Sequence, residues 1–345
     1  IAVVITFVIV KPHGFNGNAL WNFRGEVMGN IIEQLLFSAS ITGPICLMLA
    51  LGVMLKRTQV IDEHFIDVAS KLVFNVTLPA LLFLSIISSH HDLAASAPLI
   101  GYGLLANLLF FILSTYATKR FFPEPKDQGV IIQGGFRANT AIIGLAYVSN
   151  AYGESGVALA AVYVASMTLL YNIQAVICLS PRGEESSRRA FAVIIKTITK
   201  NPLIIAIMLG MLFYLLAIPV PKMVLDAGQY FANMTLPLAL LCTGGSLDIG
   251  SLRHEKYSTW FSTALKLIFA PLFITLGALM LGYRGVELAL VFLMSAAPTA
   301  AASYVMARAM GGNATLAANI IALTTVCSLL TCTLGIFILS TLGLI

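Results

Sequence analysis

Long apolar stretches alternate with short polar connections along most of this chain. Stretches of membrane-spanning length are predicted at residues 31–55, 67–89, 97–118, 130–152, 155–180, 201–220, 224–247, 258–282, 286–309 and 314–342. A helix needs about 20 mostly apolar residues to cross the hydrocarbon core of a bilayer. The pattern therefore predicts an all-α membrane protein with ten transmembrane helices.

One polar motif occurs twice inside these stretches. Asn75-Val-Thr-Leu-Pro79 returns as Asn233-Met-Thr-Leu-Pro237, at an offset of 233 − 75 = 158 residues. The same offset relates three further pairs: Pro44 and Pro202, Gly52 and Gly210, and Gly153 and Gly311. Self-similarity at a fixed offset is the signature of a duplicated structural unit. The chain is therefore predicted to consist of two related halves.

Each half holds five predicted spans, and an odd number has a geometric consequence. The second half must cross the membrane in the opposite direction, which gives two inverted five-helix repeats. Secondary transporters use this architecture and bind substrate near the midplane, where the repeats meet. The predicted divisions are an N-terminal extension at 1–30, a first repeat at 31–180, a cytoplasmic linker with an interfacial helix at 181–200, and a second repeat at 201–345.

The N-terminal extension has a different character from the rest of the chain. Its first ten residues are apolar but too few to span a bilayer, and residues 11–27 are expected to be loop-like. The native protein is expected to begin near Met28, with a signal peptide as the alternative interpretation of the extension.

Composition agrees with the spanning pattern. Hydrophobic residues make up 59% of the 345 residues, charged residues only 10%, and the mean hydropathy is +0.92. Soluble domains average about 25% charged residues, so a water-soluble protein is excluded. The net charge of +5 does not indicate a nucleic-acid partner, because the cations are scattered over short loops.

The distribution of these cations predicts the orientation. One alternating set of loops carries only four: Lys11, Arg24, Lys222 and Arg284. The other set carries fourteen, among them Lys56, Arg57, Lys119, Arg120 and Arg308. The positive-inside rule makes the second set cytoplasmic. We therefore expect a multi-pass protein of the cell inner membrane with both termini in the periplasm.

The fourth and ninth predicted spans are interrupted by small and polar residues. The fourth contains Arg137, Asn139, Thr140 and Gly144, and its counterpart contains Pro298, Thr299 and Ser303. A helix broken within the membrane is tolerated where it faces protein or a water-filled cavity. The free N–H groups of a half-helix N-terminus then form an anion site. We expect both breaks near mid-depth, with Ala138 aligned to Pro298 at an offset of 160.

Two cations lie inside predicted spans. Arg137 either binds a carboxylate in the bundle interior or extends to the cytoplasmic headgroups, and Lys266 has the same two alternatives. Asn75 and Asn233 either approach the substrate or hydrogen-bond neighbouring helices, as do Thr77 and Thr235.

Other chemistry has little support in the sequence. Metal-ligand clusters, a nucleophile elbow and a phosphate-binding glycine loop are all missing from it, so we predict no enzyme activity, no metal and no cofactor. The acidic residues of the predicted spans sit near their ends, where none is well placed for proton or sodium coupling, but such coupling is left open. The expected partners are an organic anion and the lipid bilayer, with no nucleic acid, and a homodimer is left open.

The motifs together resemble the auxin efflux carrier family, in its bacterial branch of malate or malonate permease-like transporters. The resemblance covers residues from about 31 to the end. Its motifs are Asn75-Val-Thr-Leu-Pro79, Lys200-Asn-Pro202, Leu236–Leu247, Arg137-Ala-Asn139-Thr140 and Ala297-Pro298-Thr299-Ala. It implies broken fourth and ninth helices that cross at the substrate site, with Asn139 as a substrate contact and Pro298 at the second break. Plant members have proline where this chain has Ala138.

The resulting hypothesis is a secondary active transporter of small organic anions, mono- or dicarboxylates, that works by alternating access. The alternatives are a sodium-coupled organic-anion symporter of the bile-acid type and a sensor built on the transporter fold. A channel would need a continuous polar pore, and a membrane enzyme would need clustered His, Asp or Glu at one depth.

Overall fold

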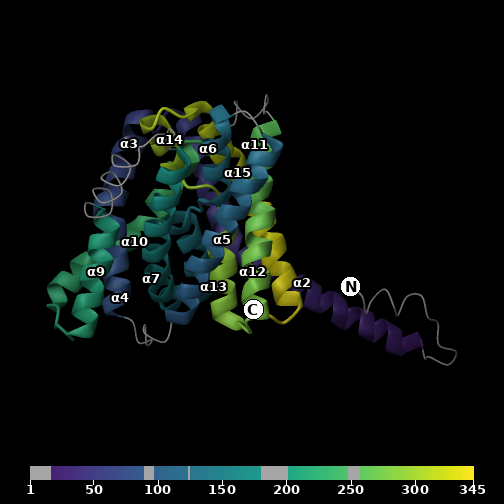
Figure 1. Cartoon of the computed structure of the whole chain (residues 1–345). Helices are drawn as coiled ribbons and strands as arrows, with labels where there is room; N and C mark the ends of the chain where they lie inside the picture. The colour runs from purple at the N-terminus through teal and green to yellow at the C-terminus, as the bar shows by residue number, and fades with distance from the viewer. Residues whose placement is uncertain (1–16, 89–96, 123–124, 180–200, 248–256) are drawn as a thin grey trace.

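A computed structural model of the chain describes residues 17–88, 97–122, 125–179, 201–247 and 257–345 (Figure 1). Within these ranges every named element is helical, and the pairing of extended backbone is confined to one antiparallel bridge between Ala138 and Thr299. The prediction of an all-α protein is therefore confirmed. The predicted linker and interfacial helix at 181–200 lie outside the described residues.

Long helices form the body of the bundle. They are α2 (Gly17–Arg57), α5 (Ala97–Phe121), α7 (Leu145–Leu179), α10 (Lys222–Gly245) and α15 (Ala314–Thr341), with the shorter α9 (Pro202–Leu215) beside them. Two further segments each contain a π-helical turn. The first joins α3 (Glu63–Leu72), η1 (Val73–Thr77) and α4 (Leu78–Ile87), and the second joins α11 (Tyr257–Ala264), η4 (Leu265–Phe269) and α12 (Ala270–Met280).

The remaining helices are short. They are α6 (Pro125–Phe136), the π-helical turn η2 (Thr140–Gly144) that leads into α7, α13 (Gly285–Ala296) and α14 (Ala302–Ala309). The chain is extended between α6 and η2, and again between α13 and α14. Both interruptions fall where the sequence predicted them.

The helices support a multi-pass membrane protein. In the described part, six segments are long and apolar enough to cross a bilayer: Ile32–Arg57, Glu63–Ile87, Ala97–Phe121, Thr140–Leu179, Tyr257–Met280 and Ala314–Thr341. Two shorter apolar helices, α9 and α13, accompany them. The breaks shorten two of the expected spans, and Lys222 and Asp226 make the start of α10 polar. The count of ten spans stays a prediction.

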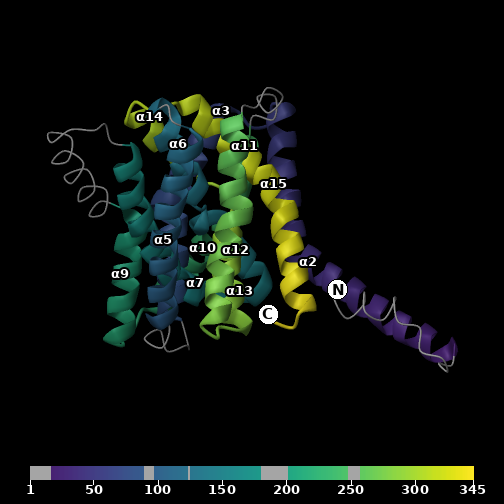
Figure 2. The same cartoon turned by 45° about the vertical axis from the view of Figure 1, so that its right-hand side comes forward.

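The first helix begins earlier than the sequence suggested. The helix α2 starts at Gly17, so the expectation of loop-like structure across 17–27 is wrong. Asparagine and glycine are common at helix starts, and no proline follows until Pro44. Figures 1 and 2 show that the first turns of α2 extend away from the bundle.

The two copies of the N-x-T-L-P motif have different local structures. In the first copy the π-helical turn η1 precedes Pro79, and the N–H of Leu78 bonds to the carbonyl of Val73. In the second copy Pro237 lies inside α10, which continues from Lys222 to Gly245. A π-helical turn is often found at functional sites, and η1 lines the cavity described below.

The helices α2 and α10 pack backbone to backbone through glycine. A Cβ atom added to Gly52 would lie 2.8 Å from the nitrogen of Gly245 and 3.1 Å from the Cα of Gly244. Small residues allow this kind of close helix crossing in membranes. The glycine at position 52 is therefore required by space rather than by backbone conformation.

This packing predicts a stability difference between two glycines of one helix. We expect Gly52→Ala to destabilise the protein by about 1–3 kcal/mol, because the added methyl group must push the two backbones apart. Gly43→Ala is the matched control, since a Cβ there meets nothing within 4 Å. Thermal unfolding in detergent would measure both variants. Equal unfolding midpoints would contradict the close crossing.

Candidate functional site

The two interrupted helices cross each other in the middle of the bundle. The segment 137–139 after α6 runs antiparallel to the segment 297–301 after α13. The N–H of Asn139 donates to the carbonyl of Pro298 at 2.7 Å, and the N–H of Ala300 donates to the carbonyl of Arg137 at 3.0 Å. The first break therefore forms without proline, with Asn139 at φ −80° and ψ 63°, outside the helical region.

Side chains hold this crossing in place. The hydroxyl of Thr299 donates to the carbonyl of Gly134 at 2.7 Å, and its N–H donates to the hydroxyl of Thr324 at 3.1 Å. Thr299 is 1% exposed. A Cβ added to Gly134 would meet the side chains of Ser262 and Ile320, so glycine at this position lets α11 and α15 pack closely against α6. Three elements, α6, the segment after α13 and α15, thus meet at one residue.

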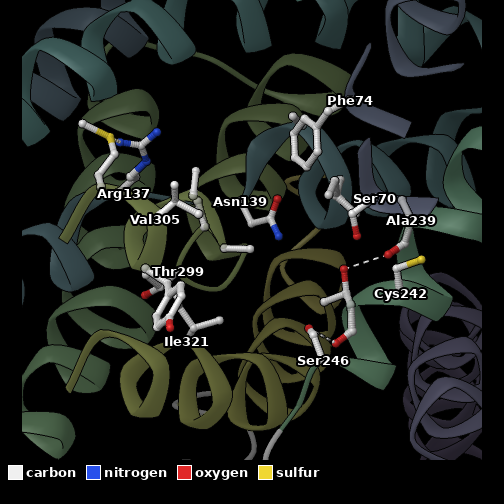
Figure 3. A pocket seen from close by; sticks show the side chains of 18 of the residues that line it. Ser70, Phe74, Arg137, Asn139, Ala239, Cys242, Ser246, Thr299, Val305 and Ile321 are labelled. Atoms are coloured by element: carbon white, nitrogen blue, oxygen red, sulfur yellow. Dashed lines mark hydrogen bonds between the residues drawn. The ribbon is translucent and has the colours of Figure 1, made fainter. Parts of the chain in front are cut away.

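A cavity of about 1160 Å³ opens beside the crossing. The crossing contributes Arg137, Asn139, Thr140 and Thr299 to its wall. Figure 3 shows Asn139 pointing into the cavity, with side chains of other helices across from it. This opposite wall includes Ser70, Phe74, Ala239, Cys242 and Ser246. The cavity continues to the helix ends around Glu63, Asn201 and Ala314.

Arg137 is buried at the edge of this cavity. Its side chain is 6% exposed, one guanidinium nitrogen donates to Asn172 Oδ1 at 2.8 Å, and another lies 2.8 Å from Met306 Sδ. Both partners are uncharged. The ion pairs within the described residues are Lys56–Glu63 and Lys71–Asp67, so Arg137 has no carboxylate partner among them. The alternative that Arg137 extends to the headgroups does not hold.

The other residues predicted from the crossing divide into two groups. Asn139 and Thr140 line the cavity and are 6% and 3% exposed. Pro298, Gly144 and Ser303 support the wall from behind and are not among the lining residues. Pro298 contributes the backbone carbonyl already described, and a Cβ on Gly144 would lie 2.9 Å from Met294 Sδ.

The two asparagines of the repeated motif lie in different places. Asn75 lines the cavity, where its side chain donates to the carbonyl of Lys71 at 2.8 Å. Asn233 is exposed on α10, accepts a hydrogen bond from Gln229 at 2.8 Å, and is not a lining residue. Thr77 and Thr235 are fully buried. The structure therefore brings Asn75 together with Arg137, Asn139, Thr140 and Thr299, but not Asn233.

Lys266 lies behind the crossing rather than in the cavity. It is 1% exposed, and its Nζ donates to the backbone carbonyl of Ser295 at 2.7 Å. The expectation that its side chain extends to the headgroups does not hold either.

Several lining residues were missed at the sequence level. Asn172 and Tyr171 of α7 and Asn319 and Thr325 of α15 reach the cavity from helices that were read only as apolar spans. Asn172 was detectable in principle, because an amide inside a span is costly unless it has a partner.

Comparisons with known proteins point to membrane transporters. The family model described as "Membrane transport protein" matches residues 42–336. A relative from Methanothermobacter thermautotrophicus, described as an uncharacterized transporter, is 24% identical over 289 residues, which cover 83% of this chain and 93% of the relative. The uncharacterized transporter YfdV of Escherichia coli K12 is 22% identical over 290 residues, 81% of this chain and 91% of the relative.

Proposed function

Because this chain belongs to the auxin efflux carrier family of membrane transport proteins, we propose that it is a secondary active transporter of small organic anions. The substrates are mono- or dicarboxylates, and the protein moves them across the cell inner membrane by alternating access. The family supports transport, and the chemistry of the cavity supports the choice of an anion.

The uncompensated charge of Arg137 is the observation that carries the proposal. A cation buried in a membrane protein is costly and usually pairs with an anion or faces water. Arg137 faces the cavity with neutral partners only, among the residues described. A guanidinium group binds carboxylates with paired, charge-assisted hydrogen bonds. A carboxylate in the cavity would supply the missing partner.

The surrounding groups fit the same ligand. The wall next to Arg137 offers the amide of Asn139 and the hydroxyl of Thr140, while the hydroxyl of Thr299 donates to Gly134 and holds the wall in place. The opposite wall adds the apolar surface of Phe74 and Ala239. A mainly apolar pocket with a few convergent polar groups is typical of small-molecule sites.

Three structural features support the inverted repeat as the basis of alternating access. Gly52 contacts Gly244, and Gly210 contacts Ile86. The two contacts are equivalent under the repeat, because Gly210 corresponds to Gly52 (210 − 52 = 158) and Gly244 corresponds to Ile86 (244 − 86 = 158). Gly153 and Gly311, also 158 apart, both have positive φ, at 61° and 76°. Each position requires glycine or strains another residue.

The crossing supplies the third feature. Its two hydrogen bonds join Asn139 to Pro298 and Ala300 to Arg137. The two hydrogen bonds are equivalent under a single offset of 161, because Pro298 then corresponds to Arg137 (298 − 137 = 161) and Ala300 corresponds to Asn139 (300 − 139 = 161). This offset is one residue more than the alignment of Ala138 with Pro298, so Ala138 is better aligned with Thr299. We infer ten helices in two inverted repeats, with the fourth and ninth broken at the crossing.

The orientation follows from the loop charges. The cavity reaches the helix ends near Glu63, Asn201 and Ala314. Figure 1 shows α3 and α14 at the same end of the bundle, and Lys56 and Arg308 lie in the last turns of α2, which precedes α3, and of α14. This end is cytoplasmic by the positive-inside rule, so the structure corresponds to a cytoplasm-facing conformation. The helix α2 begins and α15 ends at the opposite end (Figure 1), which agrees with periplasmic termini.

Transport by proteoliposomes tests the proposal. We expect saturable uptake of labelled malate or malonate by the parent protein, with Asn139→Ala raising KM about tenfold through loss of one polar substrate contact. Thr341→Ala is a suitable control, because its exposed hydroxyl bonds only within α15.

Two outcomes would change the proposal. Uptake that depends on a sodium gradient would assign the protein to sodium-coupled symport of the bile-acid type. Tight binding of these anions without flux would indicate a sensor, and a parent protein that neither binds nor moves a set of mono- and dicarboxylates would refute the organic-anion substrate.

A further inference from the structure

The C-terminal end of α13 has carbonyl groups that the following residues do not satisfy. The helix ends at Ala296, and Pro298 has no N–H to offer. The N–H groups of Thr299 and Ala300 already donate to Thr324 and Arg137. The last carbonyls of a helix need partners from elsewhere when the chain cannot cap them.

Lys266 supplies such a partner. Its Nζ donates to the carbonyl of Ser295, one residue before the end of α13, at 2.7 Å. A cation at a helix C-terminus also opposes the negative end of the helix dipole. No ion pair involves Lys266 among the described residues, and the helix end is therefore its main electrostatic partner there.

The π-helical turn that carries Lys266 contacts both halves of the crossing. Lys266 in η4 bonds to α13, while the adjacent Leu265 packs against α6, where a Cβ on Gly135 would lie 3.1 Å from the Leu265 side chain. One turn of helix thus touches the ends of both broken helices. Lys266 does not line the cavity, whereas Arg137 does.

We propose that Lys266 is a positioning residue of the substrate site. Its ammonium group holds the end of α13 and so places Thr299 and Ala300 against Gly134 and Arg137. The expected effect of Lys266 on substrate affinity rests on the proposed transport function. The structural part of the proposal concerns the backbone of residues 297–301 and is measurable without any ligand.

Hydrogen exchange on the purified protein tests the structural part. We expect Lys266→Met to accelerate amide exchange about tenfold in peptides covering residues 295–301, because a charge-assisted hydrogen bond at the helix end is lost. Lys266→Arg keeps the charge and should restore most of the protection. Lys222→Met is the matched control, since Lys222 is exposed at the start of α10.

Lys266→Gln removes the charge but keeps a hydrogen-bond donor, so it separates the two contributions. It also replaces Lys266→Met if the methionine variant does not remain monodisperse. Exchange in residues 295–301 like that of the parent, in whichever of the two variants folds, would overturn the inference. Acceleration spread equally over all helices would also overturn it, because it would indicate general destabilisation.

Uptake of labelled malonate and malate tests the effect on substrate. A positioning role predicts that the folded neutral variant has KM raised about tenfold with Vmax within about twofold of the parent, and that Lys266→Arg recovers most of the affinity. Parent-like KM in the neutral variant would overturn the role at the substrate site. A parent protein that transports neither anion would instead count against the proposed function, and the exchange measurement would still decide the structural part.

Discussion

Replacing Arg137 by glutamine is expected to reduce organic-anion uptake about 100-fold while the protein stays folded. The loss corresponds to about 3 kcal/mol, the upper range for hydrogen bonds that involve a charged group. Arg137 lines the cavity, and its present partners, Asn172 and Met306, are neutral. Removing the cation therefore removes the group that favours a negative substrate, and breaks no ion pair among the described residues.

Two further variants separate charge from shape. Arg137→Lys keeps a cation without the planar pair of donors, so uptake should recover in part. Asn172→Asp places a carboxylate where the amide oxygen lies 2.8 Å from the guanidinium. The new carboxylate would then pair with the guanidinium group that we propose binds the substrate, and uptake should fall although Arg137 is unchanged.

The measurement is initial uptake rate against concentration in proteoliposomes, with protein orientation and size-exclusion profile checked for each variant. Normal uptake in Arg137→Gln would remove Arg137 from the site. Normal uptake in Asn172→Asp alone would show that substrate does not compete for the guanidinium group.

The sequence predicted the features of this site that depend on local chemistry. Proline at 298 and the polar run from Arg137 to Thr140 indicated interrupted helices, because an unbroken apolar helix has no need of them. For Arg137 the sequence left two positions open, the bundle interior and the cytoplasmic headgroups, and the structure shows it buried. These arguments need only the residue type and its depth in a span.

The features that depend on which helices meet were not predictable in the same way. Phe74, Ser246 and Asn172 reach the cavity from three helices that are distant in sequence, and no local pattern indicates this convergence. The pairing of Lys266 with Ser295 likewise depends on how η4 lies against α13. The start of α2 at Gly17 was missed because isolated polar residues were read as loop, although they do not prevent a helix.

The repeated N-x-T-L-P motif shows both what the sequence predicts and what it does not. Its offset of 158 predicted two halves, and the same offset relates the contact of Gly52 with Gly244 to the contact of Gly210 with Ile86. Yet Asn75 lines the cavity while Asn233 lies exposed on α10. An inverted repeat predicts this difference when only one side of the membrane has access to the site, because equivalent residues then have different environments.

Thr299→Val is expected to weaken both the fold at the crossing and the affinity for substrate. Valine has nearly the same shape but cannot donate, so the carbonyl of Gly134, at the end of α6, loses the partner it now has at 2.7 Å. An unsatisfied buried carbonyl costs about 1–3 kcal/mol. We expect a lower thermal unfolding midpoint in detergent.

The effect on substrate follows from the position of Thr299 in the cavity wall. Without the bond to Gly134, the segment 297–301 is held to α6 and Arg137 by one hydrogen bond fewer. The segment can then shift relative to Arg137, although the backbone bond between Ala300 and Arg137 remains. We expect KM for labelled malate or malonate to rise about tenfold. Thr331→Val is the control, since the hydroxyl of Thr331 bonds only within α15.

The combination of the two measurements identifies the role of this hydroxyl. A lower midpoint with unchanged KM would mean that Thr299 stabilises the crossing without setting the geometry of the site. A raised KM with an unchanged midpoint would mean that it contacts substrate directly. Both changes together, absent in Thr331→Val, are the result expected if one hydrogen bond joins the broken helices and shapes the site they form.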